Sequence, residues 1–132
     1  MKKRQSGVLM HISSLPGKYG IGSFGQSAYD FVDFLVRTKQ RYWQILPLGT
    51  TSYGDSPYQS FSAFAGNTYF IDFDILIEEG LLNEVDVKGA DFGDDPRKVD
   101  YAKIFDARRP IMEKAVARFL KADDLSDYES FV

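Results

Sequence analysis

The feature that most constrains the fold is a pair of short, nearly continuous apolar runs with an amphipathic stretch between them. The runs cover residues 7–12 and 42–48, and such runs are typical of strands buried on both faces of a parallel sheet. Between them, four apolar residues recur at the spacing of one helical face: Ala28, Phe31, Val32 and Leu35. Ser27, with Asp30 three residues later, is predicted to cap this helix. The order strand, helix, strand predicts an α/β unit with parallel strands and a right-handed crossover.

A loop rich in hydroxyl groups and aromatic rings follows the second apolar run. Pro47 cannot donate a backbone hydrogen bond, so we expect the second strand to stop pairing there. Residues 52–70 read SYGDSPYQSFSAFAGNTYF and carry almost no net charge. In parallel α/β folds, functional groups lie on loops beyond the carboxyl ends of the strands. This loop is therefore the first candidate for a binding site.

The segment after the loop is predicted to alternate between short elements and a surface excursion. Residues 69–73 fit a short strand, and a helical turn is expected from Asp74 until Gly80 ends it. Residues 82–99 are acidic and contain glycine, which is typical of a surface excursion.

The last third of the chain is predicted to contain an amphipathic helix capped by Asp100 and kinked or restarted at Pro110. Its apolar stripe consists of Ile111, Met112, Ala115, Val116, Phe119 and Leu120. The charged residues beside that stripe are interpreted as a solvated face: Arg108, Arg109, Glu113, Lys114 and Arg118. Two strands do not complete a sheet, so unpaired strand edges are expected.

Composition and charge exclude several classes of function. With 16 basic and 19 acidic residues and a formal net charge of -3, the chain lacks the basic surface that nucleic acid requires, and no such partner is expected. The absence of cysteine excludes disulfides and thiolate metal sites and favours a cytoplasmic location. The basic first residues lack the apolar run of a signal peptide, and no stretch approaches the ~20 apolar residues of a membrane span. We therefore expect no membrane partner.

Three glycines, Gly20, Gly22 and Gly25, match the pattern G-x-G-x-x-G between a strand and a helix. In dinucleotide-binding folds these glycines follow the strand directly, whereas here residues 12–19 intervene. A carboxylate for the ribose is expected ~20 residues further on, but this chain has Leu46, Pro47 and Leu48 there. A tight turn into a helix is favoured, and a nucleotide-binding βαβ domain stays as the alternative.

The motif YGDSPYQS, residues 53–60, has the chemistry expected of a sugar-binding loop. A sugar ring has an apolar face and a rim of hydroxyl groups, so it is recognised by an aromatic plate beside short, rigid polar groups. Tyr53 and Tyr58 are candidate plates, and the candidate polar groups are Asp55, Ser56, Gln59 and Asn67. The spacing fits equally well a turn-rich loop that caps the end of a barrel, with its tyrosines packed inside.

Two further residues, His11 and Trp43, are each expected to have a structural role. His11 ends the first apolar run and is the only histidine, and we expect a hydrogen-bonded structural role rather than a catalytic one. Trp43 lies in the middle of the second run, where a core role is favoured over sugar binding.

Four segments together resemble one family: SLPGKYGIGSFG, RYWQILPLG, YGDSPYQSFSAFAGN and VDYAKIFDARRPIMEKA. They are similar to the 4-alpha-glucanotransferases called amylomaltases or disproportionating enzymes, glycoside hydrolase family 77. The resemblance implies a (β/α)8 TIM barrel that transfers an α-1,4-glucan segment to a glucose or maltodextrin acceptor with retention. Because members are several times longer, residues 1–132 are expected to form the N-terminal part of an incomplete barrel, with roughly 81–125 as a surface or helical excursion.

The resemblance also assigns roles to single residues. Tyr58 resembles the tyrosine that stacks on the sugar beside the cleavage point, and Ser56 resembles its neighbour on the donor side. Tyr53 and Tyr101 resemble aromatics of an outer glucan contact, whereas Asp55, Gln59 and Asn67 are expected to brace the loop. No segment matches the catalytic carboxylates, so this part is predicted to be inactive alone. A non-catalytic glucan-binding module that uses the tyrosine loop alone stays as an alternative. The resemblance implies no cofactor or metal. The expected partners are α-1,4-glucans and maltooligosaccharides. Uncovered strand edges predict that the chain self-associates.

Overall fold

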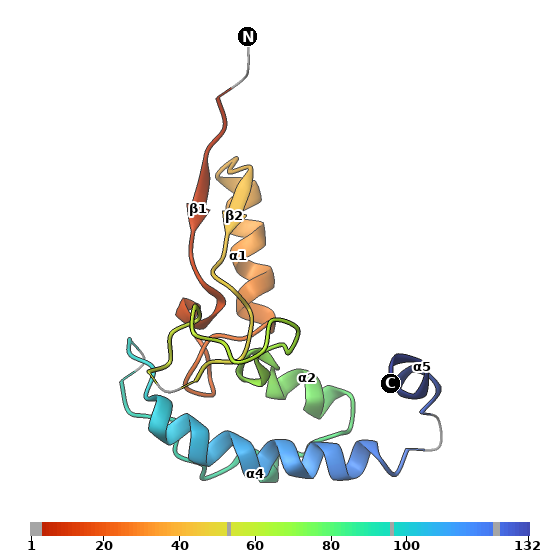
Figure 1. Ribbon diagram of the computed structural model, residues 1–132. Coiled ribbons are helices and arrows are strands. Elements are labelled where there is room, and N and C mark those ends of the chain that lie inside the picture. Colours follow the sequence, from red (N-terminus) through yellow and green to blue (C-terminus); the bar gives the residue numbers. More distant parts are fainter. Residues whose placement is uncertain (1–3, 53, 96, 123–124) are drawn as a thin grey trace.

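The computed structural model describes residues 4–52, 54–95, 97–122 and 125–132. In Figure 1, the strands β1 (Gly7–Leu9) and β2 (Tyr42–Gln44) lie beside helix α1 (Gln26–Arg37), and the long helix α4 (Tyr101–Phe119) runs across the opposite end. The remaining elements are η1 (Ile12–Ser14), η2 (Thr68–Phe70), α2 (Phe73–Glu78), α3 (Glu84–Val87) and α5 (Ser126–Phe131), of which η1 and η2 are short 3₁₀ turns. Among the described helices, none is long and apolar enough to cross a membrane.

The strand, helix, strand order produces the parallel pair that the sequence predicts. The register pairs Gly7 with Tyr42, Val8 with Trp43 and Leu9 with Gln44. The α/β class is thus confirmed, but both strands are shorter than the apolar runs. After β1 the chain turns into η1. After β2 the backbone N–H of Leu46 donates to Nδ1 of His11 at 3.3 Å and not to a neighbouring strand.

Helix α1 is confirmed, but its predicted cap is wrong. The helix begins at Gln26 with Gly25 as its N-cap, so Ser27 lies inside the first turn. The Ser27 hydroxyl donates to the Pro16 carbonyl at 2.7 Å, and Asp30 accepts from the Gln26 amide at 2.8 Å. The Ser27 hydroxyl therefore ties α1 to the preceding loop.

Residues 69–73 form helical turns, so the strand predicted there is wrong. The Asn67 side chain accepts from the backbone N–H of Tyr69 at 2.9 Å. The Asp72 side chain accepts from the N–H groups of Asp74 and Ile75 at 2.9 and 3.4 Å. Side-chain acceptors of this kind compete with a strand ladder and begin helices. Gly80, with φ +76°, follows α2 as predicted.

Helix α4 has the predicted cap, since Asp100 accepts from the N–H of Lys103 at 3.1 Å. It runs through Pro110 without interruption, so the predicted restart is wrong. Ile104, Ile111 and Ala115 are buried on one side of the helix. We attribute its continuity to this packing on both sides of the proline.

Two apolar clusters form the interior of the described chain. The first contains Ile12, Leu15, Ile21, Ala28, Phe70 and Ile104, and the second contains Tyr19, Phe73, Leu82, Ile111 and Ala115. Leu82 is only 1% exposed, and the ring of Phe92 lies 5.5 Å from that of Tyr19. The acidic segment predicted as a surface excursion therefore contributes two apolar anchors to the second cluster.

Candidate functional site

The aromatic loop lies where the sequence predicts it, beyond the carboxyl ends of the two strands. Figure 1 shows it beside the ends of β1 and β2 that face α2 and α4. Its two ends are held together by an antiparallel bridge between Gly49 and Gly66 and by a hydrogen bond from the Asn67 N–H to the Leu48 carbonyl at 2.9 Å. The loop is therefore closed at its base and projects from the sheet.

Short hydrogen bonds also brace the loop internally. The Ser52 hydroxyl donates to the Gln59 carbonyl at 2.7 Å, and the N–H of Asp55 donates to the Ser52 carbonyl at 3.0 Å. Gly54 and Asp55 both have positive φ, at 100° and 55°. Aspartate is among the few residues other than glycine that tolerate this conformation. The shape of the loop therefore depends on two consecutive residues, 54 and 55, that tolerate positive φ.

Tyr58 projects from this braced loop, and its side chain is largely open to solvent. It is 72% exposed, so its ring face is accessible to a ligand. Ser56 Oγ accepts from the backbone N–H of Tyr58 at 3.3 Å, which places the two residues against each other. Tyr53 lies outside the described residues.

A small cavity of about 130 Å³ lies beneath the loop, and Tyr101 and Asp55 line it together. Burial, and then the charge of Asp55, raise the pKa of the Tyr101 phenol. His11 also lines the cavity; its ring packs edge-on against Phe70 at 5.3 Å, and burial lowers its pKa. The predicted hydrogen bond of His11 is confirmed by its contact with the Leu46 N–H. The structure thus brings Tyr101 and Asp55 together, whereas Tyr58 lies outside this cavity.

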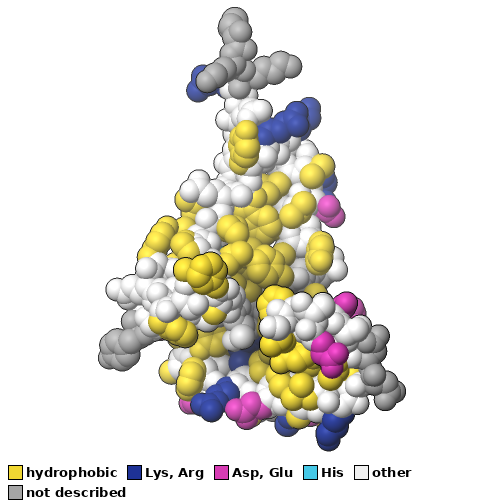
Figure 2. Space-filling model, turned by 45° about the vertical axis from the view of Figure 1, so that its right-hand side comes forward, with side chains coloured by type: hydrophobic (Ala, Val, Ile, Leu, Met, Phe, Trp, Pro, Cys, Tyr) yellow, Lys and Arg dark blue, Asp and Glu magenta, His cyan; other side chains and the backbone are white. Residues whose placement is uncertain are grey.

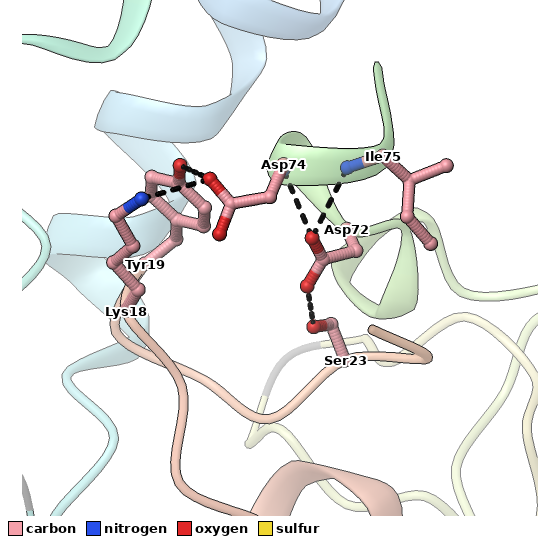
Figure 3. Close-up of polar contacts among 6 residues, drawn as sticks. All are labelled: Lys18, Tyr19, Ser23, Asp72, Asp74 and Ile75. Atoms are coloured by element: carbon pink, nitrogen blue, oxygen red, sulfur yellow. Dashed lines mark hydrogen bonds and ion pairs between the residues drawn. The ribbon is translucent and has the colours of Figure 1, made fainter. Parts of the chain in front are cut away.

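The glycine segment before α1 packs against its own chain. A Cβ on Gly22 would lie 2.0 Å from the Ile12 carbonyl oxygen, and a Cβ on Gly25 would lie 2.1 Å from Oδ2 of Asp72. This close approach allows the hydroxyl of Ser23, which lies between the two glycines in sequence, to donate to the Asp72 carboxylate (Figure 3). Close packing explains the spacing of these two glycines without a bound phosphate.

Two carboxylates of this region are engaged in structural contacts. In Figure 3, Asp74 accepts from the Lys18 ammonium at 2.8 Å and from the Tyr19 hydroxyl, while Asp72 caps α2. Both carboxylates therefore have structural roles, since Asp72 begins α2 and Asp74 ties α2 to the segment before α1. Among the described residues, no group of three or more potential metal ligands was found.

Arg108 is the polar residue that sequence reasoning placed wrongly, because it is only 2% exposed rather than on a solvated face. Its guanidinium lies 4.1 Å from the centre of the Phe73 ring and donates to the Ile71 carbonyl at 2.6 Å. A signal was present in the spacing: Arg108 follows Ile104 by four residues and precedes Ile111 by three, which places it on the buried side of α4.

Comparison with known proteins decides the family. The family model described as 4-alpha-glucanotransferase, glycoside hydrolase family 77, matches residues 10–132. The chain belongs to this family. It is 78% identical over 131 residues to a 4-alpha-glucanotransferase of Streptococcus pneumoniae, which covers 99% of this chain and 26% of that protein. A Thermus thermophilus 4-alpha-glucanotransferase is 45% identical over 128 residues, covering 97% of this chain and 25% of its own length.

A solved structure gives the same result at the level of the fold. The amylomaltase of Streptococcus agalactiae in complex with acarbose matches with a TM-score of 0.89 and 64% identity, over 92% of this chain and 24% of that one. This chain therefore spans about a quarter of the length of these members of the 4-alpha-glucanotransferase family. The resemblance stated from the sequence motifs is confirmed, and the nucleotide-binding alternative gains no support.

Proposed function

We propose that this chain supplies part of the glucan-binding cleft of a 4-alpha-glucanotransferase, with Tyr58 stacked on a glucose ring. The observation that carries the proposal is the 72% exposure of Tyr58 on a braced loop at the carboxyl ends of two parallel strands. An exposed aromatic plate held by hydrogen-bonded serines suits a ring with one apolar face and a hydroxyl rim. The structure of the solved relative named above is a complex with acarbose, which supports a saccharide ligand.

The complete protein, in this proposal, is a (β/α)8 barrel that transfers an α-1,4-glucan segment to a glucose or maltodextrin acceptor with retention. Retaining chemistry uses two carboxyl groups ~5 Å apart, one as nucleophile and one as acid and base. We assign neither group to residues 1–132, and we place residues 81–125 outside the barrel wall as an excursion. The part described here positions the sugar, so by itself it is expected to bind weakly and to turn nothing over. The absence of cysteine supports a cytoplasmic location.

The other predicted residues are included in the proposal. Ser56 accepts a hydrogen bond from the backbone N–H of Tyr58, and by the family resemblance we assign it to the donor side of the proposed subsite. Tyr101, half-buried beneath the loop with Asp55, is proposed for an outer glucan contact together with Tyr53.

The test uses a full-length chimera in which this chain replaces the matched quarter of the S. pneumoniae relative. Maltotriose is the substrate, and formation of glucose and longer maltodextrins is measured for wild type, Tyr58→Ala, Tyr58→Phe and Tyr29→Ala. Tyr29 is a matched control because it is 64% exposed but belongs to α1 and not to the loop. Tyr58→Ala is expected to lower kcat/KM about tenfold or more, and Tyr58→Phe much less, because stacking needs the ring and not the hydroxyl. Equal activity of wild type and Tyr58→Ala would overturn the stacking role.

The exposure of Tyr58 also favours a second candidate, a non-catalytic glucan-binding module. Titrating the isolated chain with maltoheptaose and following tyrosine and tryptophan fluorescence separates the two. Weak or absent binding supports the cleft proposal, whereas tight binding that Tyr58→Ala abolishes favours the module. Turnover of maltotriose by the isolated chain would contradict both candidates.

A further inference from the structure

His11 is a buried titratable group that has no part in the proposed function so far, and it lies where the parallel strands end. The last bond of their ladder runs from the Met10 N–H to the Gln44 carbonyl at 3.0 Å. In a parallel ladder the next bond would run from the Leu46 N–H to the Met10 carbonyl. That carbonyl accepts instead from the indole N–H of Trp43 at 2.7 Å, and the Leu46 N–H donates to Nδ1 of His11 at 3.3 Å. The His11 side chain therefore takes the place of one bond of the ladder.

The His11 ring contacts the chain on both sides of the aromatic loop. Leu46 leads into the loop, and Phe70, whose ring packs edge-on against the His11 ring at 5.3 Å, follows it. The same two segments meet at the base of the loop, where the Asn67 N–H donates to the Leu48 carbonyl at 2.9 Å. A shift of the His11 ring would therefore move the base from which the loop projects.

The hydrogen bond from Leu46 requires a neutral His11 ring. A neutral imidazole accepts at one nitrogen, here Nδ1, and carries its proton on the other, Nε2. A protonated ring donates from both nitrogens and would leave the Leu46 N–H without its acceptor. Hydrophobic side chains gather over much of the face shown in Figure 2, and His11 is only 8% exposed. Burial lowers the pKa of His11 below its ordinary value of 6.5, which favours the neutral form.

Two other titratable groups, Asp55 and Tyr101, line the cavity beneath the loop together with His11. Among the described residues, neither of them forms a hydrogen bond with the His11 ring. A carboxylate near the ring favours its charged form, but burial outweighs this and the pKa is lowered. A lowered histidine pKa contributes stability that is fully present above the ordinary value of 6.5 and is lost as the pH falls towards the folded pKa.

We propose that His11 is a positioning residue of the saccharide site: its neutral ring accepts the Leu46 N–H and so fixes the start of the loop that carries Ser56 and Tyr58. This inference rests on the proposed function, because His11 acts on the sugar only through that loop. When the ring takes up a proton, the bond to Leu46 is lost and the base of the loop loosens. The binding of a glucan by Tyr58 then weakens at acid pH.

The first test compares His11→Asn with His11→Leu in the full-length chimera described above. The two side chains have nearly the same shape, but only asparagine carries an acceptor as many bonds from the backbone as Nδ1. The kcat and KM for maltotriose are measured from pH 5 to 8. At pH 7, His11→Leu is expected to lower kcat/KM about tenfold, because a buried donor loses its acceptor. His11→Asn should recover most of this loss, and equal losses in the two variants would overturn the proposal.

Asparagine does not titrate, so the pH profile distinguishes this role from packing alone. The catalytic groups are common to both proteins, so their titration cancels when kcat/KM of His11→Asn is divided by that of wild type. This ratio is expected to rise as the pH falls from 7 to 5, since only wild type loses its acceptor. A constant ratio over this range would contradict the role of His11. If the melting temperature shows that His11→Leu does not fold, this ratio still decides the proposal.

A double-mutant cycle separates this inference from the proposed function. His11→Leu is introduced into the wild-type chimera and into Tyr58→Ala. Because His11 acts through the loop, its replacement should cost much less in the Tyr58→Ala background. Equal losses in both backgrounds would overturn this inference alone and leave the stacking role of Tyr58 intact. Wild-type activity of Tyr58→Ala would instead overturn the proposed function and, with it, this inference.

Discussion

Gly22 and Gly25, which precede α1, leave no room for a side chain, because other atoms lie close to the position that a Cβ would take. This gives a prediction about the addition of a single methyl group. Gly25→Ala would place Cβ 2.1 Å from Oδ2 of Asp72, so the loop or α2 must shift. We expect the free energy of unfolding to fall by about 1–3 kcal/mol, as for overpacked sites. Urea denaturation of the chain measures it.

The matched control for Gly25→Ala is Gly66→Ala, because nothing lies within 4 Å of the Cβ position at Gly66. That change is expected to leave stability unchanged or to raise it by about 0.4–1 kcal/mol through the unfolded state. Equal effects of the two changes would show that crowding at Asp72 is not the cause.

The contact of Asp74 with Lys18 and Tyr19 makes part of the stability pH-dependent. Burial opposes ionisation of Asp74, but hydrogen bonds from Lys18 and Tyr19 outweigh it and hold its pKa below the ordinary value. A lowered carboxyl pKa contributes stability that is present above the unfolded pKa, about pH 4, and is lost as the pH falls through the folded pKa. The partner cation follows the opposite rule: its hydrogen bond to Asp74 raises the pKa of Lys18 to about 12, so its contribution is lost only as the pH rises towards that value.

We therefore expect Asp74→Asn to lower the free energy of unfolding at pH 7 and to match wild type more closely as the pH falls to 2. Urea denaturation at pH 7, 5 and 3 measures this difference. Asp33→Asn serves as the control because Asp33 is exposed on α1. A difference between wild type and Asp74→Asn that stays constant across this pH range would contradict the assignment.

At the scale of elements, two helices begin at an aspartate, and they are not expected to depend on it equally. Asp100 caps α4 through the N–H of Lys103, whereas Asp72 caps α2 through two N–H groups and also accepts from Ser23. Asp100→Ala is expected to cost about 1 kcal/mol of unfolding free energy, the usual value of a cap. Asp72→Ala should cost about 2 kcal/mol or more, because it also leaves a partly buried hydroxyl without its acceptor.

Thermal and urea denaturation of the two cap variants test this order. Asp106→Ala is the control, since Asp106 is exposed within α4 and is not its cap. If Asp100→Ala were the more damaging change, the contact between Asp72 and Ser23 would have no energetic weight.

The elements predicted correctly from the sequence are those whose signal is periodic. The two apolar runs and the helical face of Leu35 gave β1, β2 and α1, because burial imposes these spacings. The strand expected at residues 69–73 failed because the side chains of Asn67 and Asp72 satisfy local N–H groups, which apolar spacing does not reveal.

The candidate site, like the fold, could be predicted from the sequence only in part. The motif placed Tyr58 on an exposed loop, but only coordinates show that Tyr101 and Asp55 share a cavity. Arg108 was misplaced because its charge was given more weight than its position between Ile104 and Ile111. Charge predicts exposure for most residues, and an arginine can be buried where an aromatic face and a carbonyl receive it.

At the scale of the whole molecule, much apolar surface is left uncovered in the described chain. Each strand pairs on one side only, and Leu9 and Tyr42 are each 60% exposed. Unpaired strand edges beside apolar side chains favour association with other chains. We therefore propose that the isolated 132-residue chain self-associates through β1 and β2.

Sedimentation velocity over a hundredfold range of concentration tests this association. Wild type is expected to sediment faster as concentration rises, and salt should not reverse this, because the contact is apolar and backbone-mediated.

Leu9→Lys should shift the chain towards monomer, since a lysine beside a strand edge opposes edge-to-edge pairing. Val85→Lys removes an exposed apolar side chain on α3, outside the sheet, and should leave association unchanged. A wild-type chain that stays monomeric at every concentration would show that its uncovered edges do not pair. If Leu9→Lys and Val85→Lys behaved alike, association would have to proceed through a surface other than the strand edges.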